Sequence, residues 1–448
     1  MIDSFKIPEY AVKQAQKLGA SDVIVAAGRG NSQQIKFVNN DIAVTKNWQD
    51  ESAGVFLAYK QRVVSANIKT FTKQEVDRTL NRLIKIAKLM PAKEDFYGLA
   101  PGKSRYKQIE GTFDRKLINF TKGADFVQAA INAGLRGGAK RVTGVFDTTY
   151  DESYVVSSNG LNTRDKGTGI SMSVRALAAP DASGHQVAQA NVLVGFDPQN
   201  LGLEAGRTAK SGLNPQQISP GKYNILFYPL PCADLLGCVA GASSITIREG
   251  GQSFFPKVGQ KVASSKLTIH DWANLPFGVD SYSFDEEGSL AQKTPIIVKG
   301  VFKNYLHNYS TAQKYKTKTT GNAGLVDPSP SNTYVVPGKL SVKAMIEKMR
   351  NGLVVTNSWY TTFSNYQRGD FSTIPRDAIF YVKNGKIVHS VKDIRISENM
   401  INLLKSIAEV GKKQTQLTSW AAEPPSFENN VITPAILFKK LNVTKSRN

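Results

Sequence analysis

Cysteine and histidine are scarce in this 448-residue chain, which contains two cysteines and four histidines. Cys232 and Cys238 lie in one apolar segment, where they resemble small buried side chains more than a disulfide framework, so a reducing compartment is expected. The histidines are isolated in sequence and form no HExxH pair of the kind that holds zinc. They are His185, His270, His307 and His389. Each is interpreted as a surface or core-edge imidazole, and the residues alone predict no metal site.

Long hydrophobic runs are also missing. The most apolar stretch, 230–246, reads LPCADLLGCVAGASSIT, and Pro229, Pro231 and Asp234 leave no uninterrupted run of about 20 apolar residues. The N-terminal stretch MIDSFKIPEYAVKQAQKLGA carries Asp3 and lacks the apolar region of a signal peptide. We therefore expect a soluble cytoplasmic protein without a membrane segment.

Motifs for nucleotide binding, calcium binding and nucleophilic catalysis are absent as well. The glycines of GRGNSQ and GLRGGAK have the wrong spacing for a phosphate or dinucleotide loop. The acidic segment 280–288, DSYSFDEEG, lacks the ligand spacing of a calcium loop. Ser243 and Ser244 lie outside a G-x-S-x-G turn, and Cys238 has no base near it in sequence. The motifs therefore identify no reaction centre.

Positive charge, in contrast, is abundant. Lys and Arg total 57 against 36 Asp and Glu, which gives a formal net charge of +21. Such a surplus attracts nucleic acid, acidic membranes or acidic peptides. The basic residues are dispersed, however, and no helix-turn-helix, RRM or zinc-finger pattern accompanies them. A lysine-rich solvated surface is therefore preferred over specific binding of nucleic acid.

Residues 1–219 are predicted to form an N-terminal α+β domain with a duplicated helix-plus-antiparallel-sheet unit. A helix followed by β-rich segments occupies 7–70, and the same order recurs over 121–194. A capping box and an apolar stripe predict a helix over 72–90, which a linker follows. Because few residues are identical between the two units, this prediction depends on the order of the elements.

Two local details accompany this prediction. The segments SDVIVAAG and QQIKFVNN are predicted as separate strands. The dipeptides Asn40-Asp41 and Asn159-Gly160 occupy equivalent places in the two units, where a two-residue hairpin turn needs positive φ.

Residues 220–448 differ in character, because short β-rich segments dominate and helices are few. This composition predicts a C-terminal domain built on a large mixed sheet or barrel, so the whole chain is assigned to the α+β class. Within this domain, the small residues of 230–246 predict a closely packed central helix that lines an interface or a cavity.

The order of several segments resembles the TldD/PmbA family, long labelled modulator of DNA gyrase. The matching segments are FVNNDIAVTKN with GVFLAYKQRVVSANI, the run DEEGSLAQKTPIIVKGVFKNYLHNYSTAQKYKTKTTGNA, PSPSNTYVVPGKLS, and NYQRGDFSTIPRDAIFYVKNGKIVHSVKDIRIS. No single motif among them is decisive, and their sequence order across nearly the whole chain carries the resemblance.

The resemblance implies a subunit without catalytic residues of its own. In the family, TldD carries an HExxxH motif and a late cysteine that hold zinc, whereas TldE, or PmbA, lacks these ligands and pairs with TldD. Here Gly237 takes the first His position, Cys238 the Glu position and Ala242 the second His position, and no cysteine follows Cys238. Glycine and alanine cannot bind zinc, and a thiol cannot replace the carboxylate base. No cofactor is expected in this chain, and zinc is expected in a TldD-type partner.

The resemblance also implies partners and a role. We expect a heterodimer with a TldD-type subunit in a zinc metalloprotease complex, with a homodimer left open, and an enclosed chamber that holds unfolded peptides. Asn322, Arg368 and Asp370 are interpreted as positions that face this chamber. Two alternatives stay open. One is a peptidase or hydrolase in its own right that uses Cys238 or a histidine, and the other is a basic nucleic-acid-associated protein.

Overall fold

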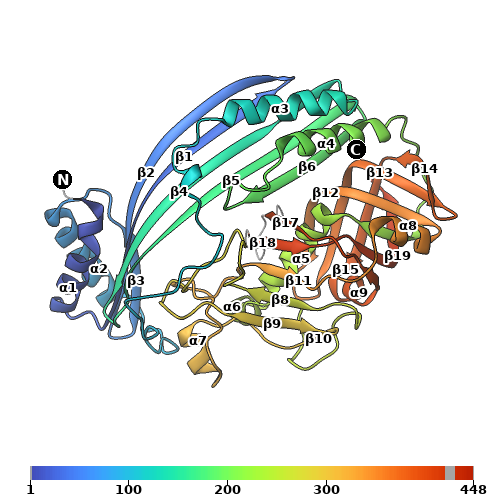
Figure 1. Ribbon diagram of the computed structural model, residues 1–448. Helices are drawn as coiled ribbons and strands as arrows, with labels where there is room; N and C mark the ends of the chain where they lie inside the picture. Colours follow the sequence, from blue (N-terminus) through green and yellow to red (C-terminus); the bar gives the residue numbers. More distant parts are fainter. Residues whose placement is uncertain (1–2, 419–428, 447–448) are drawn as a thin grey trace.

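The computed structural model describes residues 3–418 and 429–446, and a long curved antiparallel sheet dominates its N-terminal part (Figure 1). In spatial order the strands are β3 (Arg62–Asn67), β2 (Asp41–Tyr59), β1 (Asp22–Val38), β4 (Arg141–Ser157), β5 (Asn162–Ala179) and β6 (Ala182–Ala190). β1 and β4 pair at the centre, from Ile24 opposite Ser157 to Phe37 opposite Gly144. Each half of the sheet therefore consists of three consecutive antiparallel strands.

Four helices cover the convex face of this sheet, two on each half (Figure 1). α1 (Ile7–Lys17) and α2 (Lys73–Leu89) pack on the first three strands, and α1 also reaches β4. α3 (Gly123–Arg136) and α4 (Pro198–Ser211) pack on the other three, and α3 also reaches β1 and β2. The short 3-10 helices η1 (Ser4–Lys6) and η2 (Arg115–Leu117) precede α1 and α3. A separate apolar core lies under each helix pair.

The alternation of side chains gives the sheet one apolar and one polar face. In β5, Ile170, Met172 and Val174 are buried against the helices. Ser173 and Arg175, which alternate with them, lie on the opposite, concave face of the sheet. This concave face is turned toward the C-terminal part of the chain (Figure 1), so the sheet presents polar groups to that part.

The predicted α+β class is confirmed, but two details of the N-terminal strands were wrong. SDVIVAAG and QQIKFVNN belong to the single strand β1, because Gly28 and Gly30 pair with β2 on one side and β4 on the other. A Cβ atom on Gly30 would lie 2.6 Å from Asp151 Oδ1, so glycine permits the close approach. The turn between β1 and β2 has positive φ at Asn39 and Asn40, one residue earlier than predicted.

The C-terminal part contains two further sheets, below the concave face in Figure 1. The first runs in the order β10 (Val301–Phe302), β9 (Lys293–Val298), β8 (Ile269–Trp272), β11 (Thr333–Val335), β18 (Asn430–Thr433) and β17 (Thr415–Thr418). The second runs β12 (Gly352–Asn365), β7 (Gly221–Phe227), β19 (Ile436–Lys445), β15 (Ile394–Asn399), β13 (Asp370–Lys383) and β14 (Lys386–Val391), with β16 (Ile407–Val410) on β19. Because β12 also pairs with β13, five strands of this mixed sheet form a closed circuit.

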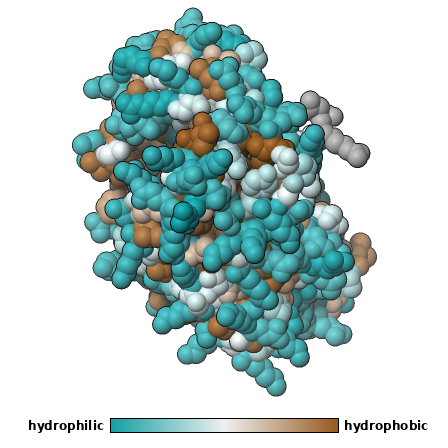
Figure 2. Space-filling model, turned by 90° about the vertical axis from the view of Figure 1, so that its right-hand side faces the viewer, coloured by the Kyte–Doolittle hydropathy of each residue, from teal (hydrophilic) through white to brown (hydrophobic). Residues whose placement is uncertain are grey.

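Helix α5 (Pro229–Ala242) lies between these two sheets, where it contacts β12 and β18. Its side chains belong to the largest apolar core of the chain. The remaining helices are short: α6 (Ile245–Glu249), α7 (Tyr309–Lys314), α8 (Val342–Met349) and α9 (Met400–Lys405). Within the described ranges, no helix is both long and apolar enough to cross a membrane. Hydrophilic residues cover most of the face shown in Figure 2, and the hydrophobic residues there form small separate groups.

Candidate functional site

A cavity of about 320 Å³ lies between the concave face of the N-terminal sheet and the loop that follows β8. β4 contributes Thr149, Asp151 and Ser153, and β5 contributes residues 165–169. The opposite wall comes from the C-terminal part of the chain, with Val279, Ser281, Tyr282 and Ser283. Ile109, Thr112 and Asn191 complete the lining. The cavity is therefore a polar space between the two parts of the molecule.

The lining combines hydrogen-bond donors with acceptors. Burial raises the pKa of Asp151 and of Asp165, and the negative charge of Asp50 raises the pKa of Asp151 further. Lys166 also lines the cavity, together with several hydroxyl groups. At Gly167 an added Cβ atom would have a single neighbour, Thr112 O at 3.9 Å, so β5 leaves open space there. Such a surface is suited to hydrogen bonding with an extended polypeptide backbone.

Polar contacts attach the sheet to the C-terminal part around this cavity. Arg175 of β5 forms an ion pair of 3.3 Å with the buried Asp377 of β13, and Ser183 of β6 donates a hydrogen bond of 2.7 Å to the same carboxylate. Farther along the sheet, Gln189 donates to Asn430 Oδ1 at 2.8 Å, and Asn191 donates to Gly278 O at 3.1 Å. These contacts fix the two walls of the cavity relative to each other.

The three residues that the resemblance aligns with the family's zinc motif lie on helix α5, in the core. Gly237, Cys238 and Ala242 are all buried. The thiol of Cys238 donates to Asp234 O at 3.3 Å, and burial raises its pKa to about 12, so it is protonated at neutral pH. No group of three or more His, Cys, Asp or Glu side chains able to hold a metal occurs in residues 3–418 and 429–446.

The histidines considered as partners of Cys238 have other surroundings. His307 is buried, and its Nδ1 lies 3.3 Å from Thr311 Oγ1. His270, on β8, pairs with Tyr334 of β11 and Pro295 of β9 in the sheet. Because Cys238 is only 4% exposed, it is not the solvent-open thiol that a cysteine nucleophile requires.

The three positions predicted to face a chamber are placed in two different environments. Asn322 is buried, and its Nδ2 donates to Asp271 Oδ1 at 2.7 Å and to Ser329 O at 3.1 Å. Arg368 and Asp370 lie at the hairpin between β12 and β13, where the exposed Arg368 forms an ion pair of 2.9 Å with the half-buried Asp370. The structure thus brings Arg368 and Asp370 together, and their role at a chamber stays a prediction.

A serine–histidine pair on the concave face was missed by the sequence analysis. Ser173 Oγ lies 2.8 Å from His185 Nε2. The amide nitrogen of Asn357, Nδ2, lies 3.1 Å from His185 Nδ1 and donates a hydrogen bond of 2.7 Å to Asp377 Oδ2. The amide oxygen, Oδ1, accepts a hydrogen bond from the Ser358 backbone N–H. These contacts orient the Asn357 amide so that its NH₂ group faces His185 Nδ1. Nδ1 must therefore accept a hydrogen bond from this group.

The resulting tautomer decides what the pair can do. With Nδ1 as acceptor, the proton of the neutral imidazole is on Nε2, which donates to Ser173 Oγ. A general base for serine needs the opposite tautomer, with a free lone pair on Nε2. Burial lowers the pKa of His185 to about 4, so the ring is neutral. The pair therefore acts as a hydrogen-bonded contact between β5 and β6, and only the strand register could have revealed it.

Three family models match consecutive parts of the chain. The PmbA/TldA metallopeptidase C-terminal domain matches residues 220–445, the central domain matches 116–213, and domain 1 matches 25–87. A metalloprotease of Methanothermobacter thermautotrophicus is 30% identical over 61% of this chain, and the match spans 64% of that protein. Metalloprotease PmbA of Escherichia coli is 26% identical over 91% of each chain.

A solved structure shares the fold. TldE from Thermococcus kodakarensis superimposes with a TM-score of 0.85 at 20% identity, over 98% of this chain and 100% of that one. At this identity the likeness establishes the architecture alone. Since the C-terminal family model alone matches half of the residues and the other two models match most of the N-terminal part, this chain belongs to the PmbA/TldD metallopeptidase family.

Proposed function

We propose that this chain is the non-catalytic, TldE-like subunit of a zinc metalloprotease complex with a TldD-type partner. One observation carries the proposal: the family's zinc-helix positions, as the resemblance aligns them, hold Gly237, Cys238 and Ala242, all buried in α5. Zinc in proteins is held by three or four His, Cys or carboxylate side chains, and none of these three residues is a histidine or a carboxylate. The partner subunit would supply both the metal and the hydrolytic step.

In this proposal the chain contributes one side of a chamber that holds unfolded peptide. The polar cavity between β4, β5 and the loop at 279–283 supports this role, because its hydroxyl, carboxyl and backbone groups are suited to an extended chain. Side-chain specificity is expected to be low, since backbone hydrogen bonds are common to all peptides. The complex is expected to act in the cytoplasm.

Reconstitution tests the proposal. The purified chain is mixed with a TldD-type subunit from the same source, and the mixture is analysed by size-exclusion chromatography and assayed on casein. The proposal predicts a stable heterodimer with more casein cleavage than the TldD-type subunit gives alone. Two separate peaks and unchanged cleavage would contradict it.

A further inference from the structure

A second cavity, of about 540 Å³, opens beside α6 and α7, and five basic residues contribute to its lining. They are Arg248, Lys257, Lys293, Lys303 and Lys318. None of the described residues that line it is Asp or Glu. The cavity thus concentrates positive charge in one concave place, whereas basic residues are dispersed over the sequence as a whole.

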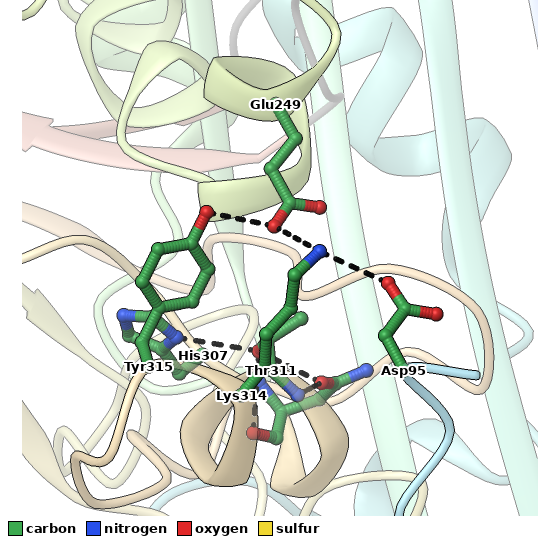
Figure 3. Close-up of polar contacts among 7 residues, drawn as sticks. Asp95, Glu249, His307, Thr311, Lys314 and Tyr315 are labelled. Carbon is green, nitrogen blue, oxygen red and sulfur yellow. Dashed lines mark hydrogen bonds and ion pairs between the residues drawn. The ribbon is translucent and has the colours of Figure 1, made fainter.

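Two carboxylates near α6 and α7 are engaged by a different lysine, Lys314 (Figure 3). Lys314 Nζ lies 2.7 Å from Glu249 Oε1 and 3.0 Å from Asp95 Oδ2. The Tyr315 hydroxyl donates to the same Glu249 oxygen at 2.8 Å. Glu249 and Asp95 raise the pKa of Lys314, which stays charged and offsets one of their two negative charges. The three side chains together carry one net negative charge, against five positive charges in the lining of the cavity.

The five basic side chains form no ion pair within the described residues. Arg248 lies over the Tyr305 ring at 5.3 Å, and Lys293 lies over the Trp272 ring at 3.7 Å. Lys257, Lys303 and Lys318 are exposed at the cavity. Several like charges in one concavity repel one another and focus a positive potential, which a multivalent anion would relieve.

The neutral part of the lining indicates what kind of anion fits. Thr311 Oγ1 donates its one proton to Asn308 Oδ1 at 2.8 Å, so His307 Nδ1, 3.3 Å away, must be the donor between the ring and this hydroxyl. Burial lowers the pKa of His307 to about 4, so the ring is neutral and its Nε2 is an acceptor. A peptide backbone supplies N–H donors for such an acceptor, whereas a deprotonated polyphosphate does not.

We propose that this cavity binds an acidic segment of an extended peptide, with Asp or Glu carboxylates at the lysines and backbone N–H groups near His307. Four of the five cations are lysines, whose long flexible side chains can follow carboxylates at varied positions. The inference extends the proposed peptide-holding function, but it depends on the charge of this cavity and can be tested with the chain alone.

The test is fluorescence anisotropy with a labelled peptide of alternating Glu and Gly. The K257Q/K303Q/K318Q variant is expected to bind it at least about fivefold more weakly than the wild type, because three exposed ion pairs are lost. K257R/K303R/K318R is expected to retain binding. A matched variant, K17Q/K69Q/K85Q, removes the same charge from the N-terminal helices and their surroundings and is expected to stay within about twofold of the wild type.

Two results would overturn the inference. Equal weakening by both glutamine triples would mean that net charge alone attracts the peptide. Tighter binding of tripolyphosphate than of the Glu-Gly peptide would mean that the cavity is a phosphate site. Both measurements use the chain without a partner subunit. If the cavity does not bind acidic peptide, the proposed heterodimer is unaffected. If the heterodimer does not form, the result for the cavity is unaffected.

Discussion

The thiol of Cys238 shows how burial decides the chemistry of one residue. It is enclosed in α5, and its pKa is raised to about 12, so little thiolate forms at neutral pH. We predict that iodoacetamide at pH 7.5 leaves the folded chain unmodified, whereas both cysteines react after unfolding in urea. Intact-mass spectrometry of the two samples measures this. Rapid modification of Cys238 in the folded chain would instead support a cysteine nucleophile.

The buried Glu287 makes stability depend on pH. Burial, followed by the charge of Asp285, raises its pKa from 4.5 to about 8. Because the folded pKa is the higher one, the stability that Glu287 contributes is complete below about pH 4.5 and is lost as the pH rises toward about 8. The Glu287→Gln variant is therefore expected to gain stability over the wild type between about pH 5 and 8, by on the order of 2 kcal/mol.

Urea denaturation at several pH values in that range measures the gain. Glu51→Gln, at an exposed residue of β2, removes the same charge and serves as the control for net charge. A gain for Glu287→Gln that does not change with pH would contradict the account of this side chain.

At the scale of elements, one buried carboxylate joins the N-terminal sheet to the C-terminal part. Asp377 of β13 accepts from Arg175, Ser183 and Asn357. Asp377→Ala would leave the buried Asn357 and the half-buried Arg175 and Ser183 without their acceptor, and a loss of about 3 kcal/mol in the free energy of unfolding is expected. Asp370 provides the contrast: it pairs with the exposed Arg368 and accepts from Asn399, and Asp370→Ala is expected to cost about 1 kcal/mol.

Both variants can be compared by urea denaturation at neutral pH. Equal losses for the two aspartates would show that Asp377 does not anchor the interface. The Asp377 backbone has a φ of 58°, a conformation that asparagine tolerates well, so Asp377→Asn separates the loss of charge from backbone strain.

A larger side chain on strand β5 would fill the polar cavity and test whether it holds peptide. Gly167 lines it, and an added Cβ atom would meet only Thr112 O, at 3.9 Å. Gly167→Phe is expected to occupy the space and to reduce casein cleavage by the reconstituted complex severalfold, while Gly167→Ala retains most of it. Circular dichroism and size-exclusion chromatography confirm that each variant is folded and paired. Full activity of a folded, paired Gly167→Phe complex would exclude this cavity from the peptide path.

The sequence predicted elements where local signals are strong. α2 begins where expected, since Thr72 Oγ1 accepts from the Glu75 backbone N–H at 3.1 Å. α4 was missed because small residues, among them Gly202, Ala205 and Gly206, form its buried face and give little hydrophobic periodicity. The walls of the polar cavity could not be predicted, because they come from strands and a loop more than a hundred residues apart that only the tertiary fold brings together.

At the scale of the whole molecule, the arched sheet and the loop at 279–283 form the walls of a polar cavity, while α5 packs in the largest apolar core. The chain has a formal net charge of +21, but the charge is divided unevenly between the two cavities. Two aspartates and one lysine line the polar cavity, whereas five basic residues line the second. This division agrees with the proposed role of the chain in holding a peptide.

The metal content of the isolated chain tests this account most directly. The chain is expressed without a TldD-type subunit, purified without chelator, exposed to excess zinc and desalted, and zinc is then measured by mass spectrometry alongside a casein assay. The account predicts far less than one zinc per chain and no casein cleavage. One tightly held zinc per chain together with cleavage of casein would contradict it.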